Sequence, residues 1–216
     1  MRRIVLALIL LPTALPAAAQ TVGVRAGLGS AKTVLAGGIA FEPCMPDRDC
    51  PGFPTGSARS VTVGADLSIS LVGEGLQIRV GAAYARKGGA ASGRYADGEP
   101  LNGKLSLGYL QISSLLLLRG PVRPSSRLSG GLLFGPWFAI PLGCRVHRQV
   151  ARSCSGFDSE GPDRGLAVGG GVELKLLSGS SLGLDAVYYR GLEEVGTLGE
   201  TTRFVAIQAG VVFPID

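Results

Sequence analysis

The segment from Ser60 to Leu71 alternates without a break between apolar residues and polar or small ones. Valine, alanine, leucine and isoleucine occupy its odd positions, and serine, threonine, glycine and aspartate occupy its even positions. A period of two is typical of a β-strand with two unlike faces. Soluble strands are usually about 5–6 residues long, whereas a tilted strand of about 10 crosses the hydrocarbon core of a bilayer. The segment therefore predicts a membrane-crossing strand.

The same pattern recurs along the rest of the chain, and one face of each segment carries no charge. The 34 glycines argue against a helical protein, because each glycine inside a helix costs about 1 kcal/mol. We therefore predict an all-β fold, an eight-stranded antiparallel up-and-down transmembrane β-barrel. Its predicted strands are 21–28, 60–71, 76–85, 105–119, 126–142, 164–177, 180–192 and 203–213.

The lengths of the predicted connections alternate between short and long. The second, fourth and sixth strands are followed by the short segments 72–75, 120–125 and 178–179, and the others by long ones. Outer-membrane barrels have short turns on the periplasmic side and longer loops outside, and an even strand count puts both termini in the periplasm. Residues 33–42 fit either a strand extending above the membrane or a different pairing.

A soluble barrel of the lipocalin type is the competing interpretation, with its apolar faces turned inward. Two features favour the membrane barrel: the polar faces are rich in glycine, alanine and serine, and they are poor in the lysine and glutamate that coat soluble surfaces. Eight strands enclose little more than side chains, so an aqueous pore is not expected. Leu115, Leu117, Leu133 and Trp137 would fill the interior further, although a bulge at Pro136 could turn Trp137 outward.

The first 19 residues resemble a secretory signal peptide. Arg2 and Arg3 precede an apolar run too short to span a bilayer as a helix, and Ala17 to Ala19 supply a small-residue cleavage site before Gln20. We predict a signal peptide over 1–19 and a barrel domain over 20–216, located in the bacterial outer membrane. Cleavage lowers the formal net charge from +5 to about +3, so the basic balance says little about partners.

Short motifs in most of these strands resemble the PorT-like outer-membrane β-barrel family. They are Val24–Gly27, Tyr84–Gly89, Tyr109–Leu116, Gly135–Phe138 and Leu184–Leu192. The resemblance implies an eight-stranded barrel in a bacterial envelope, and some relatives are linked to protein secretion.

The chain departs from the family pattern at three positions. Gln111 stands where the family often has glutamate, Ser113 where it often has proline, and Val187 where arginine is common. These departures put a family-specific interior charge network in doubt, and a secretion role would follow from the fold by analogy alone.

The four cysteines fall into two local pairs, Cys44 with Cys50 and Cys144 with Cys154. Export to an oxidising compartment favours disulfides, and pairing within each loop requires no docking of one loop onto another. Three connectivities remain possible from the sequence alone. The competing interpretation is a metal site with His147, although the spacings lack the close repeats of zinc sites.

His147 is the only histidine, so a serine hydrolase or acyltransferase would have to use it as the base. Ser153 and Ser155 are near in sequence but are equally ordinary in a solvated loop. Arg145, Arg148 and Arg152 join His147 in a basic loop that could bind the phosphates of lipopolysaccharide. The alternative is a solvated loop whose charge is balanced by Asp158, Glu160 and Asp163.

Charged residues also occur on the inward faces of the predicted strands. Buried charges are costly unless they are paired, which predicts a network of ion pairs rather than an ion pathway. The predicted network consists of Arg25, Asp66, Arg79, Glu173, Lys175 and Asp185.

The sequence thus predicts a non-enzymatic envelope barrel with no cofactor, monomeric, surrounded by outer-membrane lipid. Its disulfide-stiffened loops would contact an unidentified protein partner. The alternatives are an accessory of a secretion system and a barrel that binds or transports a small ligand. Nucleic-acid binding is not expected, because the chain has no suitable aromatic platform or helix motif.

Overall fold

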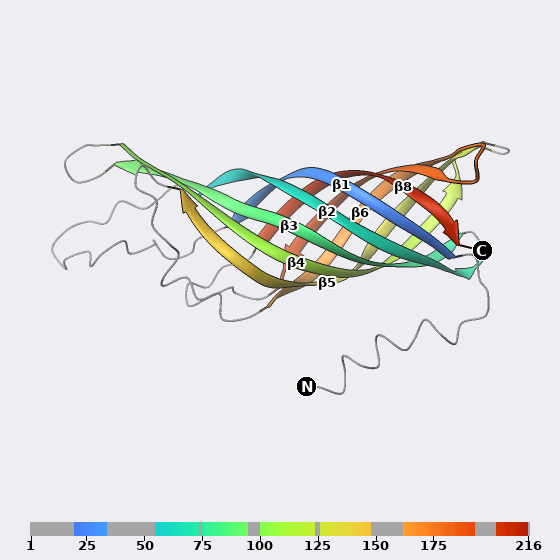
Figure 1. Ribbon diagram of the computed structural model, residues 1–216, viewed down its shortest axis with the longest axis horizontal. Helices are drawn as coiled ribbons and strands as arrows, with labels where there is room; N and C mark the ends of the chain where they lie inside the picture. The colour runs from blue at the N-terminus through green and yellow to red at the C-terminus, as the bar shows by residue number, and fades with distance from the viewer. Residues whose placement is uncertain are drawn as a thin grey trace, which may run out of the picture.

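The computed structural model describes residues 20–33, 55–73, 75–94, 100–123, 126–147, 162–192 and 202–215. Every strand pairs antiparallel with the next, and β8 pairs with β1, which closes a barrel (Figure 1). The predicted eight-stranded up-and-down barrel is confirmed. The strands are β1 (Gln20–Thr33), β2 (Thr55–Val72), β3 (Leu76–Arg94), β4 (Pro100–Pro121), β5 (Leu128–His147), β6 (Asp163–Lys175), β7 (Ser181–Gly191) and β8 (Thr202–Ile215). No helix in the described part of the chain is long and apolar enough to cross a membrane.

The first and last described residues, Gln20 and Ile215, pair with one another at one end of the barrel. The short connections after β2, β4 and β6 lie at this same end, which we call the turn end. Gly73 and Gly179 lie in two of these turns with φ of 53° and 83°, a backbone conformation that glycine adopts without steric cost. The opposite end is the loop end.

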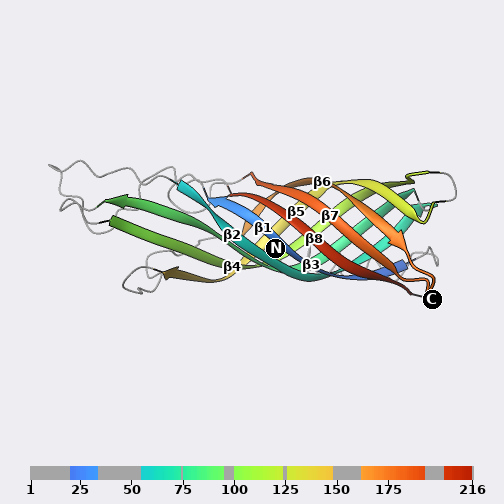
Figure 2. The same ribbon diagram turned by 90° about the horizontal axis from the view of Figure 1, so that it is seen from above.

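The strands differ from the predicted ranges mainly at the loop end. β3 and β4 stay paired as far as Arg94 and Pro100 and project beyond the other strands (Figures 1 and 2). At the turn end, two predicted strand ends are turns instead. Ser126 precedes β5 because its hydroxyl accepts a hydrogen bond from the Leu128 amide, and Leu176 follows β6 because its amide bonds to the Ser180 carbonyl.

The apolar faces of the strands point outward. Leu28, Leu132 and Ile207 are 70%, 64% and 58% exposed, and similar residues cover the outer face of every strand. A soluble barrel with an apolar interior and a polar surface is therefore the wrong interpretation. An apolar wall that continues around a closed barrel is typical of a surface in contact with lipid. Tyr84 and Phe213 lie on this wall near opposite ends, as interfacial aromatic residues do.

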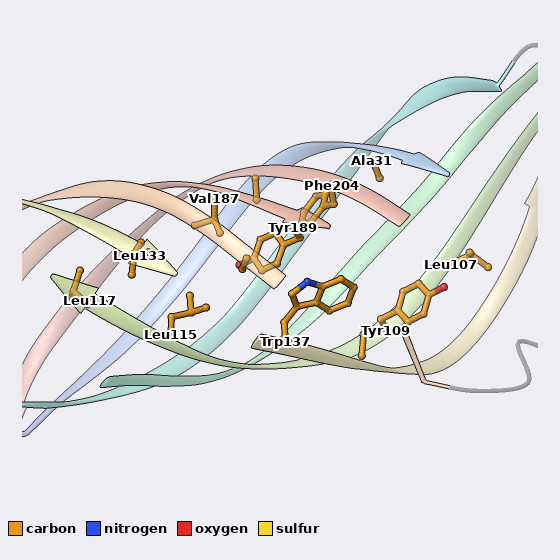
Figure 3. Close-up of a cluster of buried hydrophobic side chains, with 13 residues drawn as sticks. Ala31, Leu107, Tyr109, Leu115, Leu117, Leu133, Trp137, Val187, Tyr189 and Phe204 are labelled. Carbon is orange, nitrogen blue, oxygen red and sulfur yellow. The ribbon is translucent and has the colours of Figure 1, made fainter. Parts of the chain in front are cut away.

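The inward faces fill the barrel with small, charged and large hydrophobic side chains. Leu115, Leu117, Leu133 and Trp137 are buried in this interior, as predicted. Trp137 points inward despite the preceding proline, because Pro136 and Trp137 keep regular pairing with β6. Figure 3 shows Trp137 among the other buried hydrophobic side chains, where it lies beside Tyr189.

Candidate functional site

Four charged side chains from four strands meet in the middle of the barrel. Each of them points inward, because successive side chains of a strand point to opposite faces and the adjacent residues in sequence lie on the apolar outer face. The group, here called the central cluster, consists of Arg25 of β1, Asp66 of β2, Arg79 of β3 and Asp185 of β7. The sequence predicts these four residues as part of its network, and the structure brings them together.

The central cluster is a closed ring of ion pairs. Arg25 donates from Nε to Asp66 at 2.6 Å and from Nη1 to Asp185 at 2.7 Å. Arg79 donates from Nη1 to the same Asp185 oxygen at 2.7 Å, and its Nε lies 3.6 Å from Asp66. Two arginines therefore face two aspartates, and all four are less than 10% exposed. The ring is electrically neutral, as a buried group of charges must be.

Glycines beside the central cluster make room for it. Arg25 is flanked by Gly64 on β2 and Gly210 on β8, and Asp66 by Gly23 on β1 and Gly81 on β3. Gly171 stands opposite Asp185, and a Cβ at Gly171 would lie 1.9 Å from a carboxylate oxygen of Asp185. A Cβ at Gly23 would lie 2.8 Å from a carboxylate oxygen of Asp66, and one at Gly210 would lie 2.6 Å from Arg25 Cγ, so these glycines leave the space that the charged groups occupy.

The other two residues of the predicted network lie nearer the turn end. Glu173 forms an ion pair with Arg119 at 2.5 Å. Arg119 is not among the residues of the network that the sequence predicts. Lys175 is exposed, because β6 ends there and the barrel no longer encloses its side chain. The structure thus places Lys175 outside the buried network.

A second charged group lies toward the loop end. Asp163 accepts a hydrogen bond from Thr202 at 2.7 Å, and Lys87 Nζ lies 3.8 Å from the same carboxylate. The expectation that Asp163 belongs to a solvated loop is wrong, because Asp163 begins β6 and is 1% exposed. Lys87 continues the inward parity of Arg79 and Ala85, so extending the strand beyond 85 would have identified it.

Aromatic rings surround Lys87 and close the barrel above the central cluster. The ammonium lies 4.1 Å from the centroid of Trp137, 5.1 Å from Tyr109 and 5.7 Å from Phe204. Tyr189 stacks on Phe204 and meets Trp137 edge to face. Figure 3 shows these four rings, here called the aromatic plug, gathered inside the strands.

The free space beside the central cluster is small. A void beside the central cluster, lined also by Gln111 and Tyr189, offers about 50 Å³ to water-sized molecules. That volume suits a few waters, since one water needs about 10–15 Å³ by this measure, and drug-sized ligands occupy sites of about 300–1,000 Å³. This part of the interior has room for water but not for a drug-sized solute.

The structure does not describe the side chains of the predicted loop residues. Cys44, Cys50, Arg148, Cys154 and Arg152 fall outside the described residues. Cys144, Arg145 and His147 belong to the last residues of β5, where only the backbone is described. The described residues contain no group of three or more histidine, cysteine, aspartate or glutamate side chains able to hold a metal ion.

No family model and no curated protein sequence matches the chain. The resemblance to the PorT-like family therefore stays a prediction. Solved structures do match: the outer membrane protein OprG from Pseudomonas aeruginosa superposes with a TM-score of 0.53 at 11% identity, over 92% of this chain and 96% of OprG. This likeness shows the fold alone.

Two further structures resemble the chain less closely. Neisserial surface protein A aligns with a TM-score of 0.46 at 15% identity, over 89% of this chain and 96% of that one. Ail, the attachment invasion locus protein of Yersinia pestis, aligns with a TM-score of 0.43 at 11% identity, over 91% and 99%.

Proposed function

We propose that this chain is a non-enzymatic barrel of the bacterial outer membrane that serves as an envelope component and presents its loop end to a partner outside the cell. The observation that carries the proposal is an apolar outer wall closed around a filled interior. Such a wall is stable in contact with lipid, and closed barrels with an even number of strands are the form that spans the bacterial outer membrane.

The filled interior argues against solute transport. The aromatic plug, the central cluster and the Arg119–Glu173 pair succeed one another between the loop end and the turn end. Only about 50 Å³ is open to water beside the central cluster. Specific contacts are therefore assigned to the outside of the barrel and to its loops.

The loop end is proposed to face the outside, with disulfides Cys44–Cys50 and Cys144–Cys154 stiffening the contact surface. Long loops on the outer side and short turns in the periplasm are the rule for such barrels. The basic residues Arg145, His147, Arg148 and Arg152 would add an anion-binding loop to this surface.

The proposal is tested by epitope insertion in cells that express the full chain. One tag is inserted within 95–99, between β3 and β4, and a matched tag within 124–125, between β4 and β5. Antibody should label the first tag on intact cells and the second only after the outer membrane is permeabilised. Equal labelling of both, or labelling of neither until the inner membrane is opened, would contradict the proposal. A mild-detergent pull-down of the same cells then tests for a secretion-system partner.

A further inference from the structure

Among the strand residues whose side chains the structure describes, five arginines point outward from the barrel, and all five lie near the loop end. Each is exposed and alternates with inward-facing neighbours on its strand. We call them the arginine belt: Arg59 of β2, Arg86 of β3, Arg164 of β6, Arg190 of β7 and Arg203 of β8. The described basic residues at the turn end, Arg123, Arg127 and Lys175, lie in the turns or at a strand end instead.

The strand register places the belt at a similar level on neighbouring strands. Arg190 stands directly opposite Arg203 on β8, and Arg164 lies two residues from Leu166, the partner of Arg190 on β6. Across β1, Ser30 pairs with both Val205 of β8 and Arg59 of β2. Val61 of β2 then pairs with Arg86 of β3. The belt thus runs around the barrel from β6 to β3.

The belt lies at the edge of the apolar wall. On each of these strands, the residue two positions from the arginine toward the turn end lies on the same face and is apolar or aromatic. These neighbours are Val61, Tyr84, Leu166, Tyr188 and Val205. A step from tyrosine and aliphatic residues to arginine is expected where hydrocarbon gives way to lipid headgroups.

No carboxylate shares the outer face with the belt among the described residues. The four described acidic residues, Asp66, Asp163, Glu173 and Asp185, all point inward. Arg190 and Arg203 moreover oppose one another directly, and like charges in that position repel. Among the described residues, the outer face therefore offers concentrated positive charge at the headgroup level, and no described acidic side chain lies beside Arg59, Arg86, Arg190 or Arg203.

We propose that the arginine belt binds the phosphate groups of lipopolysaccharide in the outer leaflet. The guanidinium group matches phosphate oxygens with paired hydrogen bonds, and a basic ring next to a membrane attracts anionic lipid. The choice of lipopolysaccharide rests on the proposed function, because that function puts the loop end in the outer leaflet. The belt is separate from the loop residues between Arg145 and Arg152.

The test compares three proteins folded in phosphatidylcholine vesicles: the wild type, R190Q/R203Q, and the matched control R123Q/R127Q, which removes two exposed arginines from the turn end. Lipopolysaccharide is titrated into the vesicles, and the unfolding temperature is read from the gel shift between folded and unfolded bands. The wild type and the control should gain stability alike. The belt variant should need ~30-fold more lipopolysaccharide for a half-maximal shift, since each of the two arginines near an anionic surface contributes about fivefold.

Three additional arms identify the ligand. Dephosphorylated lipopolysaccharide, phosphatidylglycerol at equal charge and inorganic phosphate at equal concentration should each give a smaller shift than intact lipopolysaccharide. An equal shift from any of them would overturn the assignment, as would equal titrations for the wild type and the belt variant. If R190Q/R203Q gives no folded band, R59Q/R203Q is measured instead with the same expected loss. Correct surface labelling of the inserted tags together with unchanged titrations would reject the belt proposal while leaving the proposed function standing.

Discussion

Asp185 Oδ2 accepts hydrogen bonds from Arg25 of β1 and Arg79 of β3, so one oxygen joins three strands across the interior. A buried ion pair often adds little net stability over an apolar pair. Its effect on register is larger, because a slip of one residue would turn the charge onto the apolar wall. We infer that the central cluster selects the correct register among the possible pairings.

Replacing Asp185 with alanine should lower the free energy of unfolding by about 3 kcal/mol, because two buried guanidinium groups lose a carboxylate. Urea unfolding in lipid vesicles, followed by Trp137 fluorescence, measures the change. Arg123→Ala serves as the control, since it removes an exposed charge from a turn and should change stability by less than about 0.5 kcal/mol. Equal free energies of unfolding for the two variants would show that the ring of ion pairs does not stabilise the barrel.

Gly171 tests the space beside the central cluster. Gly171→Ala should destabilise the barrel by about 1–3 kcal/mol, because its new Cβ would overlap the Asp185 carboxylate. Gly130→Ala is the matched control on β5, where the nearest atom to a new Cβ is 3.6 Å away on Val122. The same unfolding measurement applies, and a tolerated Gly171→Ala would contradict the described packing.

At the scale of the strands, alternation predicts that each strand has two unlike faces, and the signal peptide, the short and long connections and the composition of the polar faces then predict that the apolar face points outward. Alternation also predicts the four charges of the central cluster, since inward parity can be read from each strand separately. Arg119 has the inward parity of Leu115 and Leu117, so the same reasoning could have included it at the end of the predicted strand 105–119. Its pairing with Glu173 could not be predicted, because parity does not show which inward side chains meet across the interior. Lys87 and Asp163 were missed because alternation weakens near the loop end, where the predicted strands stopped too early.

Strand β7 offers a test of which surface meets lipid. Leu184→Arg should cost about 2–4 kcal/mol, because an arginine there must leave water for the hydrocarbon region. Leu192→Arg, just beyond the loop end of β7, should cost about 0–1 kcal/mol. Both positions are exposed leucines, with 49% and 61% exposure, so they form a matched pair. Equal costs in vesicles would contradict the assignment of the apolar wall to lipid.

At the scale of the whole molecule, the described interior contains equal numbers of inward-facing acids and buried or half-buried inward-facing bases. The bases are Arg25, Arg79, Lys87 and Arg119, and the acids are Asp66, Asp163, Glu173 and Asp185. A balanced interior closed by aromatic rings suits a structural filling rather than a conducting path. The excess positive charge of the described strands instead lies on the outer face.

Reconstituted protein should therefore show no conductance. Planar bilayers containing the wild type are expected to give no discrete current steps, and liposomes containing it should not swell with small sugars. A general porin in the same lipid serves as the positive control. Reproducible steps from heat-shiftable, folded protein would contradict the closed interior and favour the transport alternative.

The central claim is that the chain is a barrel whose apolar wall is embedded in the outer membrane. Cells expressing the full chain are fractionated, and the outer-membrane fraction is run on a denaturing gel with and without boiling. The protein should appear in that fraction and migrate differently before and after boiling, because a folded barrel resists detergent until it is heated. Recovery in the soluble fraction, or a single unchanged band in both samples, would contradict the claim.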